Sequence, residues 1–210
     1  MIFKIFPEKF WDLIATRYAA SPIADMAAYK VKIEKIQSYL SPDDMVMDIG
    51  CGTGTQCMDL SGDVKQVTGI DISGKLLAIA DQRKAARKIE NVVFIKTSLF
   101  DERFQPGSFD VVMAFYVLHF FEDIDAAFQR IHDLLKPEGV IICETACMGE
   151  KNKMAGGLLR LAGHLGFLPT INLLTTRQLE QALERAGLSL VDKTKFSELN
   201  NEYTLIAKKQ

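Results

Sequence analysis

The order of apolar and polar residues divides most of the chain into short apolar runs and longer segments with helical periodicity. The apolar runs predict buried strands at residues 45–49, 66–71, 92–96, 109–114 and 140–144. Between them, amphipathic segments predict helices at residues 55–60, 73–90 and 123–135. Strands that alternate with helices in this way predict a parallel sheet covered on both faces, with ligands at the carboxyl ends of the strands.

Residues 1–40 show helical periodicity and no strand pattern. One apolar stripe comprises Phe10, Leu13, Ile14, Arg17 and Tyr18, and a second comprises Val31, Ile33, Ile36, Tyr39 and Leu40. A Ser-Pro-Asp-Asp sequence at residues 41–44 ends the second helix. Two interpretations stay open: these helices cover the sheet, or they cap a ligand pocket with Tyr18 lying over it.

A glycine-rich turn follows the first predicted strand. That strand carries one carboxylate, Asp48, and a buried carboxylate is costly unless a cationic or hydrogen-bonding group meets it. Glycines at positions 50, 52 and 54 permit positive φ angles and let a ligand approach the backbone beside the next helix. The turn therefore predicts a nucleotide-type pocket, with a glycine turn that binds no ligand as the alternative.

The glycine spacing argues against a dinucleotide. NAD and FAD sites usually carry G-x-G-x-x-G, whereas here glycines fall at positions 50, 52 and 54 and are followed by Thr55. An acidic residue about 20 positions beyond the first glycine binds ribose hydroxyls in nucleotide folds, and Asp71 stands at that distance from Gly50, at the end of the second strand. Asp71 is therefore a candidate ribose ligand.

Composition is that of an ordinary soluble protein. The chain has 210 residues, 48% of them hydrophobic and 25% charged, and we expect a single domain spanning residues 1–210. A net charge of −2 gives no electrostatic footprint for nucleic acid. The basic residues of the helix at 73–90 predict a solvated face (Lys75, Arg83, Lys84, Arg87 and Lys88).

Two further features concern location and metal binding. Pro7 and Glu8 interrupt the apolar N-terminal residues before a signal-peptide core can form, so we expect a cytoplasmic protein. The cysteines at positions 51, 57, 143 and 147 lack the C-x-x-C pairs that structural zinc sites favour. We therefore expect buried free thiols and no metal site.

Five stretches, in this order, resemble motifs of the class I S-adenosylmethionine-dependent methyltransferases. They are Asp-Ile-Gly-Cys-Gly-Thr-Gly at 48–54, Gly-Ile-Asp-Ile-Ser at 69–73, Ser-Phe-Asp-Val-Val at 108–112, Val-Leu-His at 117–119 and Leu-Lys-Pro-Glu-Gly at 135–139. The resemblance, which spans about half the chain, implies an α/β fold with a Rossmann-like, mostly parallel, seven-stranded sheet whose last strand is antiparallel. Residues 188–195 and 202–208 then fit the last two strands, after a helix at 177–186.

The resemblance also implies S-adenosylmethionine as cofactor, S-adenosylhomocysteine as product and a set of cofactor contacts. Asp48 would lie near the methionine amino group and Asp71 would hold the ribose hydroxyls, while Ile72 would pack on the adenine. The turn would pack against the methionine and ribose through Gly50, Cys51, Gly52 and Gly54.

The adenine contact departs from the family pattern. Similar enzymes often carry an acidic residue near the end of the third strand, where this chain has Ser98. Either Ser98 substitutes, or Asp101 reaches in from the loop, or the contact is missing; we favour Ser98. We add Leu99 and Phe115 to the expected cofactor contacts, together with Tyr18.

Methyl transfer from a sulfonium centre requires alignment of acceptor and methyl group and exclusion of water, and it needs no nucleophilic side chain. A base near the methyl group helps when the acceptor is a phenol, a hydroxyl or a protonated amine. His119, after the fourth strand, and Glu144, at the end of the fifth, are the candidate catalytic residues. For His119 a structural role at a helix start is the alternative.

Residues 149–175 form an apolar insert between the fifth strand and the last helix. Leucines and one phenylalanine alternate there with small residues, and Arg160, His164 and Pro169 argue against a membrane span. Three hypotheses stay open: a lid over a hydrophobic acceptor, a dimer contact, or a helix at 154–174 that touches a membrane surface. We favour the lid, in a protein that is a monomer or a homodimer.

The sequence thus predicts a methyltransferase acting on a small, hydrophobic or aromatic molecule, such as a quinone or a phenolic intermediate. Two other classes of function remain as alternatives. One is a non-catalytic nucleotide-binding or regulatory module of the same fold, and the other is an NAD-dependent oxidoreductase. A nucleic acid or protein acceptor lacks support from the charge distribution.

Overall fold

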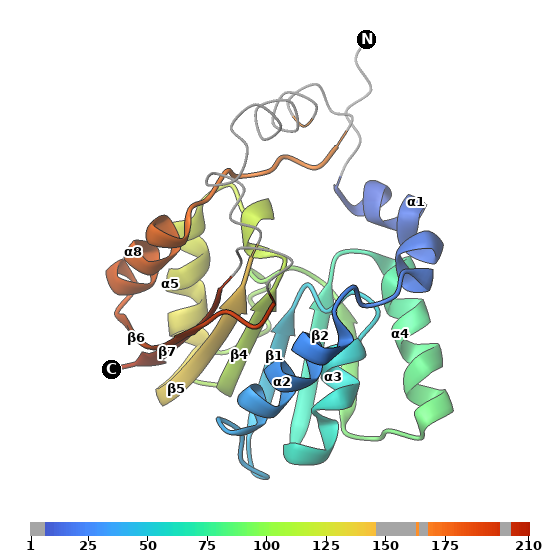
Figure 1. Cartoon of the computed structure of the whole chain (residues 1–210), viewed down its shortest axis with the longest axis horizontal. Helices are drawn as coiled ribbons and strands as arrows, with labels where there is room; N and C mark the ends of the chain where they lie inside the picture. Colours follow the sequence, from blue (N-terminus) through green and yellow to red (C-terminus); the bar gives the residue numbers. More distant parts are fainter. Residues whose placement is uncertain (1–6, 146–162, 164–167, 198–202) are drawn as a thin grey trace.

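The computed structural model describes residues 7–145, 163, 168–197 and 203–210, which form a seven-stranded sheet with helices on both faces (Figure 1). The strands are β1 (Met45–Ile49), β2 (Gln66–Asp71), β3 (Val92–Lys96), β4 (Phe109–Phe115), β5 (Leu135–Glu144), β6 (Leu188–Thr194) and β7 (Thr204–Lys209). Their spatial order is β3-β2-β1-β4-β5-β7-β6. Strands β1 to β5 are parallel, and β7 is antiparallel to both β5 and β6. The predicted fold class is confirmed.

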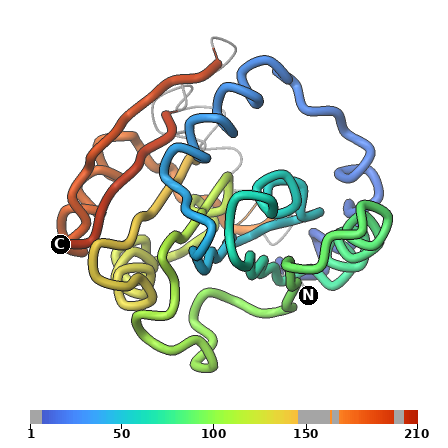
Figure 2. The backbone as a smooth tube through the Cα atoms, turned by 90° about the horizontal axis from the view of Figure 1, so that it is seen from below, coloured from blue at the N-terminus to red at the C-terminus, as the bar shows by residue number. Residues whose placement is uncertain are grey.

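The helices are α1 (Pro7–Ala20), α2 (Met26–Gln37), α3 (Thr55–Asp59), α4 (Gly74–Arg87), α5 (Ile124–Leu134) and α8 (Thr176–Arg185), with short 3-10 turns η1 (Ser61–Asp63) and η2 (Leu118–Phe120). Helix α1 packs against α4 near the β3 edge of the sheet, whereas β6 and α8 lie at the other edge (Figure 2). Helix α1 therefore lies next to α4 on the β3 side of the sheet.

Alternating residues of β1 divide the core into two layers. Val46 packs with Ile36 of α2 and Cys57 of α3, whereas Met47 and Ile49 belong to the layer that contains α5 and α8. Because successive side chains of a strand point to opposite faces, Asp48 shares the face of Val46 and lies under α3.

Side-chain caps explain why two predicted helix starts agree with the structure. The Ser73 hydroxyl accepts a hydrogen bond from the Leu76 backbone N–H, and the Asp123 carboxylate accepts one from Ala126 N–H. Each cap satisfies a backbone donor that has no partner within the helix. Both helices consequently begin one residue after these caps.

Three predicted details are wrong. Leu13 and Val31 are members of the predicted apolar stripes, yet their exposed fractions are 76% and 53%. Helix α1 packs on α4, and α2 turns Ile36 toward the core in place of Val31. The fifth strand was expected from residue 140, but Leu135 already pairs with Phe109. The intervening turn is held by Lys136, whose ammonium group lies 2.7 Å from an Asp110 carboxylate oxygen.

Candidate active site

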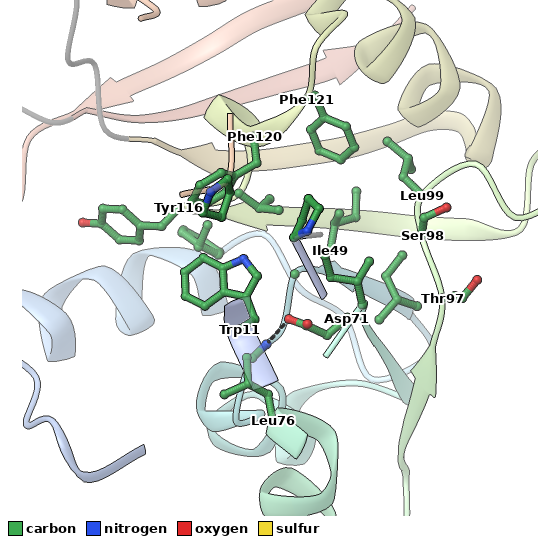
Figure 3. Close-up of a pocket in the computed structure, with 18 of the residues that line it drawn as sticks. Trp11, Ile49, Asp71, Leu76, Thr97, Ser98, Leu99, Tyr116, Phe120 and Phe121 are labelled. Carbon is green, nitrogen blue, oxygen red and sulfur yellow. Dashed lines mark hydrogen bonds between the residues drawn. The ribbon is translucent and has the colours of Figure 1, made fainter. Parts of the chain in front are cut away.

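Two adjoining cavities open at the carboxyl ends of the parallel strands. The smaller has a volume of about 270 Å³ and is enclosed by the ends of β1, β2 and β4, the loop after β3, and α1 (Figure 3). The larger, of about 660 Å³, lies between the sheet and the segment joining α1 to α2. Of the residues that the structure describes, four line both cavities: Tyr18, Gly50, Phe115 and Tyr116. The two spaces therefore meet over the glycine turn.

The glycine turn forms the floor of this junction. The backbone N–H groups of Gly50 and Cys51 both donate to the Ile70 carbonyl, at 2.8 and 3.0 Å. Gly50 has a φ of +67°, and a Cβ there would lie 2.7 Å from Val117 Cγ2. Only glycine fits position 50, and the exposed backbone beside it is open to a ligand.

Gly54 is closely packed by its neighbours. A Cβ at this position would lie 2.3 Å from Phe94 Cζ and 3.1 Å from Ala80 Cβ. Gly54 lines neither of the two cavities. Its lack of a side chain allows β3 and α4 to pack against the turn, and a cofactor contact by Gly54 stays a prediction without geometric support.

Asp71 lies on the floor of the smaller cavity, at the end of β2 (Figure 3). Its carboxylate accepts hydrogen bonds from Gly52 N–H at 3.0 Å and Ser73 N–H at 2.8 Å, and burial raises its pKa. A carboxylate has about four acceptor positions, so Asp71 keeps acceptor capacity for ligand hydroxyls. Ile72, predicted to pack on the adenine, also lines this cavity.

Asp48 lies below the cavities, with an exposed fraction of 2%, and lines neither of them. Burial raises its pKa to about 7, and the Cys57 thiol donates to Oδ2 at 3.1 Å. The contact with a cofactor amino group that the resemblance implies stays a prediction. Cys51, Cys57 and Cys143 are free thiols, and Cys147 lies outside the described residues.

The loop after β3 places Ser98 and Leu99 at the smaller cavity, together with Thr97. Asp101 does not line it. Its carboxylate binds the Thr97 hydroxyl at 2.5 Å and the Arg103 guanidinium, which holds the pKa of Asp101 well below its usual range. Of the two adenine partners considered, Ser98 is the one that lies at the cavity.

An aromatic cluster covers the mouth of the smaller cavity. Trp11 of α1 contacts Tyr18 and Phe120 edge to face, with ring centroids 6.0 and 5.5 Å apart. Tyr18 also lies over Gly52, since a Cβ on Gly52 would be 3.6 Å from Tyr18 Cε1. The sequence analysis missed Trp11, although residues seven positions apart, as Trp11 and Tyr18 are, share one face of a helix.

His119 is buried beside the site. Its exposed fraction is 7%, its Nδ1 lies 2.7 Å from Thr145 Oγ1, and burial lowers its pKa to about 4. The ring packs on Phe120, and the residue lines neither cavity. An imidazole of this kind is uncharged and weakly basic at neutral pH, so a catalytic role for His119 stays a prediction that its environment disfavours.

Glu144 lines the larger cavity and has three partners. Oε2 lies 3.2 Å from the Lys32 ammonium and accepts from the Thr204 hydroxyl at 2.5 Å, while Oε1 accepts from the Tyr116 hydroxyl. Lys32 and Thr204 come from α2 and β7. Sequence reasoning missed Lys32, because a lysine within an amphipathic helix gives no sign that it is buried.

Arg83 differs from the solvated residue that was predicted. Its guanidinium donates to the Thr53 hydroxyl and to the Ala19 carbonyl, both at 2.8 Å. It therefore connects α4 with the glycine turn and with the end of α1. Arg83 also lines the larger cavity, so it belongs to the site as a positioning residue.

Most of the insert at 149–175 lies outside the described residues. In its described part, Pro169 and Thr170 line the smaller cavity, and Asn172 N–H donates to the His119 carbonyl at 2.7 Å. Within the described ranges, no helix has the length and apolarity needed to cross a bilayer. The same part of the chain holds no group of His, Cys, Asp and Glu side chains arranged to bind a metal.

Comparison with known proteins assigns this architecture to a family. A family model described as a methyltransferase domain matches residues 40–187. The demethylmenaquinone methyltransferase of Lactococcus lactis is 34% identical over 101 residues, which cover 47% of this chain and 40% of that protein. The 2-phytyl-1,4-naphtoquinone methyltransferase of a Nostoc species is 32% identical over 46% of this chain and 44% of its own length. The matched stretches thus span less than half of these relatives.

Solved structures agree on the fold. The cyclase SpnF superposes with a TM-score of 0.76 at 17% identity, covering 96% of this chain and 94% of its own. A geranyl diphosphate methyltransferase in complex with S-adenosylmethionine superposes with a TM-score of 0.70 at 16% identity, covering 86% of this chain and 85% of its own.

The residues at the smaller cavity fit this cofactor. Asp71 offers acceptor positions for hydroxyl groups, the glycine turn permits close approach of a ligand to the backbone, and the aromatic cluster covers the opening. The match to the family model spans more than half of the chain. The chain therefore belongs to the methyltransferase-domain family.

Proposed function

We propose that the protein transfers a methyl group from S-adenosylmethionine to a small, apolar, aromatic acceptor. The observation that carries this proposal is the junction of the two cavities over Gly50, where Tyr18, Phe115 and Tyr116 line both. A cofactor in the smaller cavity and an acceptor in the larger one can meet only there. The junction therefore defines the region where methyl transfer would occur.

On the cofactor side, each residue has a definite task. Asp71 accepts hydrogen bonds from ribose hydroxyls, and Ser98 and Leu99 lie where the base would bind. Trp11 and Tyr18 cover the opening and exclude water, which strengthens polar interactions inside. S-adenosylmethionine supplies the electrophilic methyl group, and the protein needs only to align the acceptor with it.

On the acceptor side, the wall of the junction is aromatic. The two curated relatives described above are named for their action on a menaquinone precursor and on a naphthoquinone. Phe115 and Tyr116 offer flat surfaces to which an aromatic ring can stack. These points support a quinone-type or phenolic acceptor.

Asp71→Asn gives the test of the cofactor site. Calorimetry should detect S-adenosylhomocysteine binding to the wild type, and the variant should bind about tenfold to hundredfold more weakly, because a hydrogen bond to a charged group contributes about 1.5–3 kcal/mol. Asp81→Asn is the matched control, since Asp81 lies on the outside of α4 and, among the described residues, pairs with Lys84 alone. Binding of NAD in place of S-adenosylhomocysteine would refute the proposal and support an oxidoreductase.

A second candidate function is a reaction, or a binding role, without methyl transfer. The structural similarity to a protein named as a cyclase supports this second candidate, because one fold can serve different chemistries. Turnover separates the two. The proposal expects methylated product from at least one member of a panel of phenols and hydroquinones, and cofactor binding without any turnover would support the second candidate.

A further inference from the structure

A largely buried polar cluster lies in the wall of the larger cavity. We call it the Glu144 cluster; its members are the buried Lys32, Glu144 and Thr204, together with Tyr116, which is 42% exposed. Lys32 and Glu144 have exposed fractions of 8% and 7%, and Thr204 is buried as well. An ion pair removed from water in this way is a weak source of stability, so its presence calls for another explanation.

The hydrogen bonds of Glu144 leave room for a ligand. Oε2 receives Lys32 and Thr204, whereas Oε1 receives only Tyr116 among the described residues. An ionised carboxylate can accept about four hydrogen bonds. One acceptor position therefore remains on Oε1. This oxygen accepts from Tyr116, which lines both cavities at their junction.

The backbone of Tyr116 is unusual. Its φ is +54°, a left-handed value that costs free energy in a residue other than glycine. Its N–H donates to the Glu144 carbonyl at 2.7 Å, and its hydroxyl donates to the carboxylate of the same residue. Strained conformations that a structure holds at a pocket are often part of a mechanism.

Lys32 sets the charge of the cluster. Its ammonium lies 5.1 Å from the ring centroid of Phe115 and 5.6 Å from that of Tyr116. The ammonium group lies 3.2 Å from the buried Glu144 carboxylate and offsets part of the cost of burying that group. Within the described ranges, Lys32 and Tyr116 are the charged or titratable groups that contact the carboxylate. A buried carboxylate with an open acceptor position is suited to receive a proton.

We propose that the Glu144 cluster removes the proton from an acceptor that carries an ionisable hydroxyl, as a phenol or hydroquinone does. This inference rests on the proposed function and adds the acceptor class and the base. The hydroxyl proton moves to Glu144 Oε1, and the O–H electron pair stays on the acceptor. The Tyr116 hydroxyl then turns from Glu144 to the new oxyanion. That electron pair forms the bond to the methyl carbon as the carbon–sulfur electrons leave with sulfur, giving S-adenosylhomocysteine.

The test uses 1-naphthol, with 1-methoxynaphthalene as the matched ligand that has no proton to give. Both are titrated by calorimetry into the protein saturated with S-adenosylhomocysteine. The wild type should prefer 1-naphthol by at least about tenfold, and Glu144→Gln and Tyr116→Phe should lose that preference. Equal or undetectable binding of the two ligands to the wild type would overturn the proposal.

The pH dependence of 1-naphthol methylation distinguishes a base from a merely structural carboxylate. In Glu144→Gln the rate should fall by about a hundredfold or more at neutral pH. It should then recover by about tenfold per pH unit until the naphthol ionises on its own, because solvent must remove the proton. A variant profile parallel to that of the wild type, or no methylation by the wild type, counts against the proposal.

Lys35→Met controls for folding. Lys35 lies one turn from Lys32 on α2 and pairs with Asp192 of β6 at 2.6 Å, so it also ties α2 to the sheet without lining either cavity. Lys32→Met should lose the preference for 1-naphthol, and Lys35→Met should keep it. If both behave alike, the ion pair is structural and the inference fails. Loss of S-adenosylhomocysteine binding by the wild type would instead refute the proposed function itself.

Discussion

Gly52 and Gly54 offer a matched pair of substitutions within one turn. Both have left-handed backbone angles, with φ of +55° and +71°. Their surroundings differ. A Cβ on Gly54 would lie 2.3 Å from Phe94 Cζ, whereas a Cβ on Gly52 would meet nothing closer than Tyr18 Cε1 at 3.6 Å. Gly54→Ala therefore tests packing and Gly52→Ala tests the ligand-facing side of the turn.

The expected magnitudes follow from these distances. A left-handed conformation costs an alanine about 1–2 kcal/mol, and both variants carry this cost. Gly54→Ala adds an overpacking cost of about 1–3 kcal/mol, because Phe94 and Ala80 must move. We expect the free energy of unfolding to fall by about 1–2 kcal/mol in Gly52→Ala and by about 2–5 kcal/mol in Gly54→Ala.

Two assays separate the variants. Urea denaturation followed by circular dichroism gives the unfolding free energies, and calorimetry gives the affinity for S-adenosylhomocysteine. Gly52→Ala should lose the larger share of affinity, because its methyl group projects toward Tyr18 at the cavity. Phe94→Leu should relieve part of the cost of Gly54→Ala, which serves as an internal control. Equal unfolding free energies for the two alanine variants would refute this reasoning.

Three further predictions concern charges in and around the site. Lys32→Met should lower the unfolding free energy by about 3–5 kcal/mol, since it leaves the buried Glu144 carboxylate without its cation. Lys35→Met should lower it by less than about 1 kcal/mol, because the Lys35 side chain is partly exposed. Urea denaturation of the two variants compares these values. Burial raises the pKa of Asp48 from 3.8 to about 7, so folding favours the protonated form of this carboxyl. Relative to Asp48→Asn, the unfolding free energy of the wild type should therefore fall as pH rises from about 4 to about 7. Parallel curves of unfolding free energy against pH for the two proteins would contradict this. Arg83→Met should release the end of α1, because it removes the hydrogen bond to the Ala19 carbonyl. The fluorescence of Trp11, the one tryptophan of the chain, should then shift to longer wavelength. An unchanged emission spectrum would argue against a positioning role for Arg83.

The sequence predicts the elements of the sheet well where both faces of a strand are buried. Strands β1 and β2 have the bounds expected from their apolar runs, because turn residues flank them on both sides. It predicts α1 less well. Leu13 points to solvent while Trp11 faces the cavity, and the hydrophobic pattern alone cannot distinguish a helix that covers a core from one that borders a pocket.

The candidate site also has one part that the sequence predicts and one part that it does not. Local sequence patterns find the glycine turn and Asp71, because their chemistry lies in consecutive residues or at a fixed spacing. The Glu144 cluster joins residues from α2, β5 and β7, together with the residue after β4. No spacing in the sequence predicts that these residues lie in contact. This contact arises from strand order and from the packing of α2 against one face of the sheet.

The position of β7 has a consequence for folding. This strand is the last in sequence order but lies inside the sheet, between β5 and β6. During synthesis β5 therefore keeps an open, apolar edge, because Ile141 and Cys143 cannot pair with Ala207 and Leu205 until β7 has been made. Open strand edges of this kind attract other chains, so the interval before β7 emerges from the ribosome is the period of greatest aggregation risk. Substitutions in β7 should accordingly reduce the soluble yield of the protein more than they reduce its equilibrium stability.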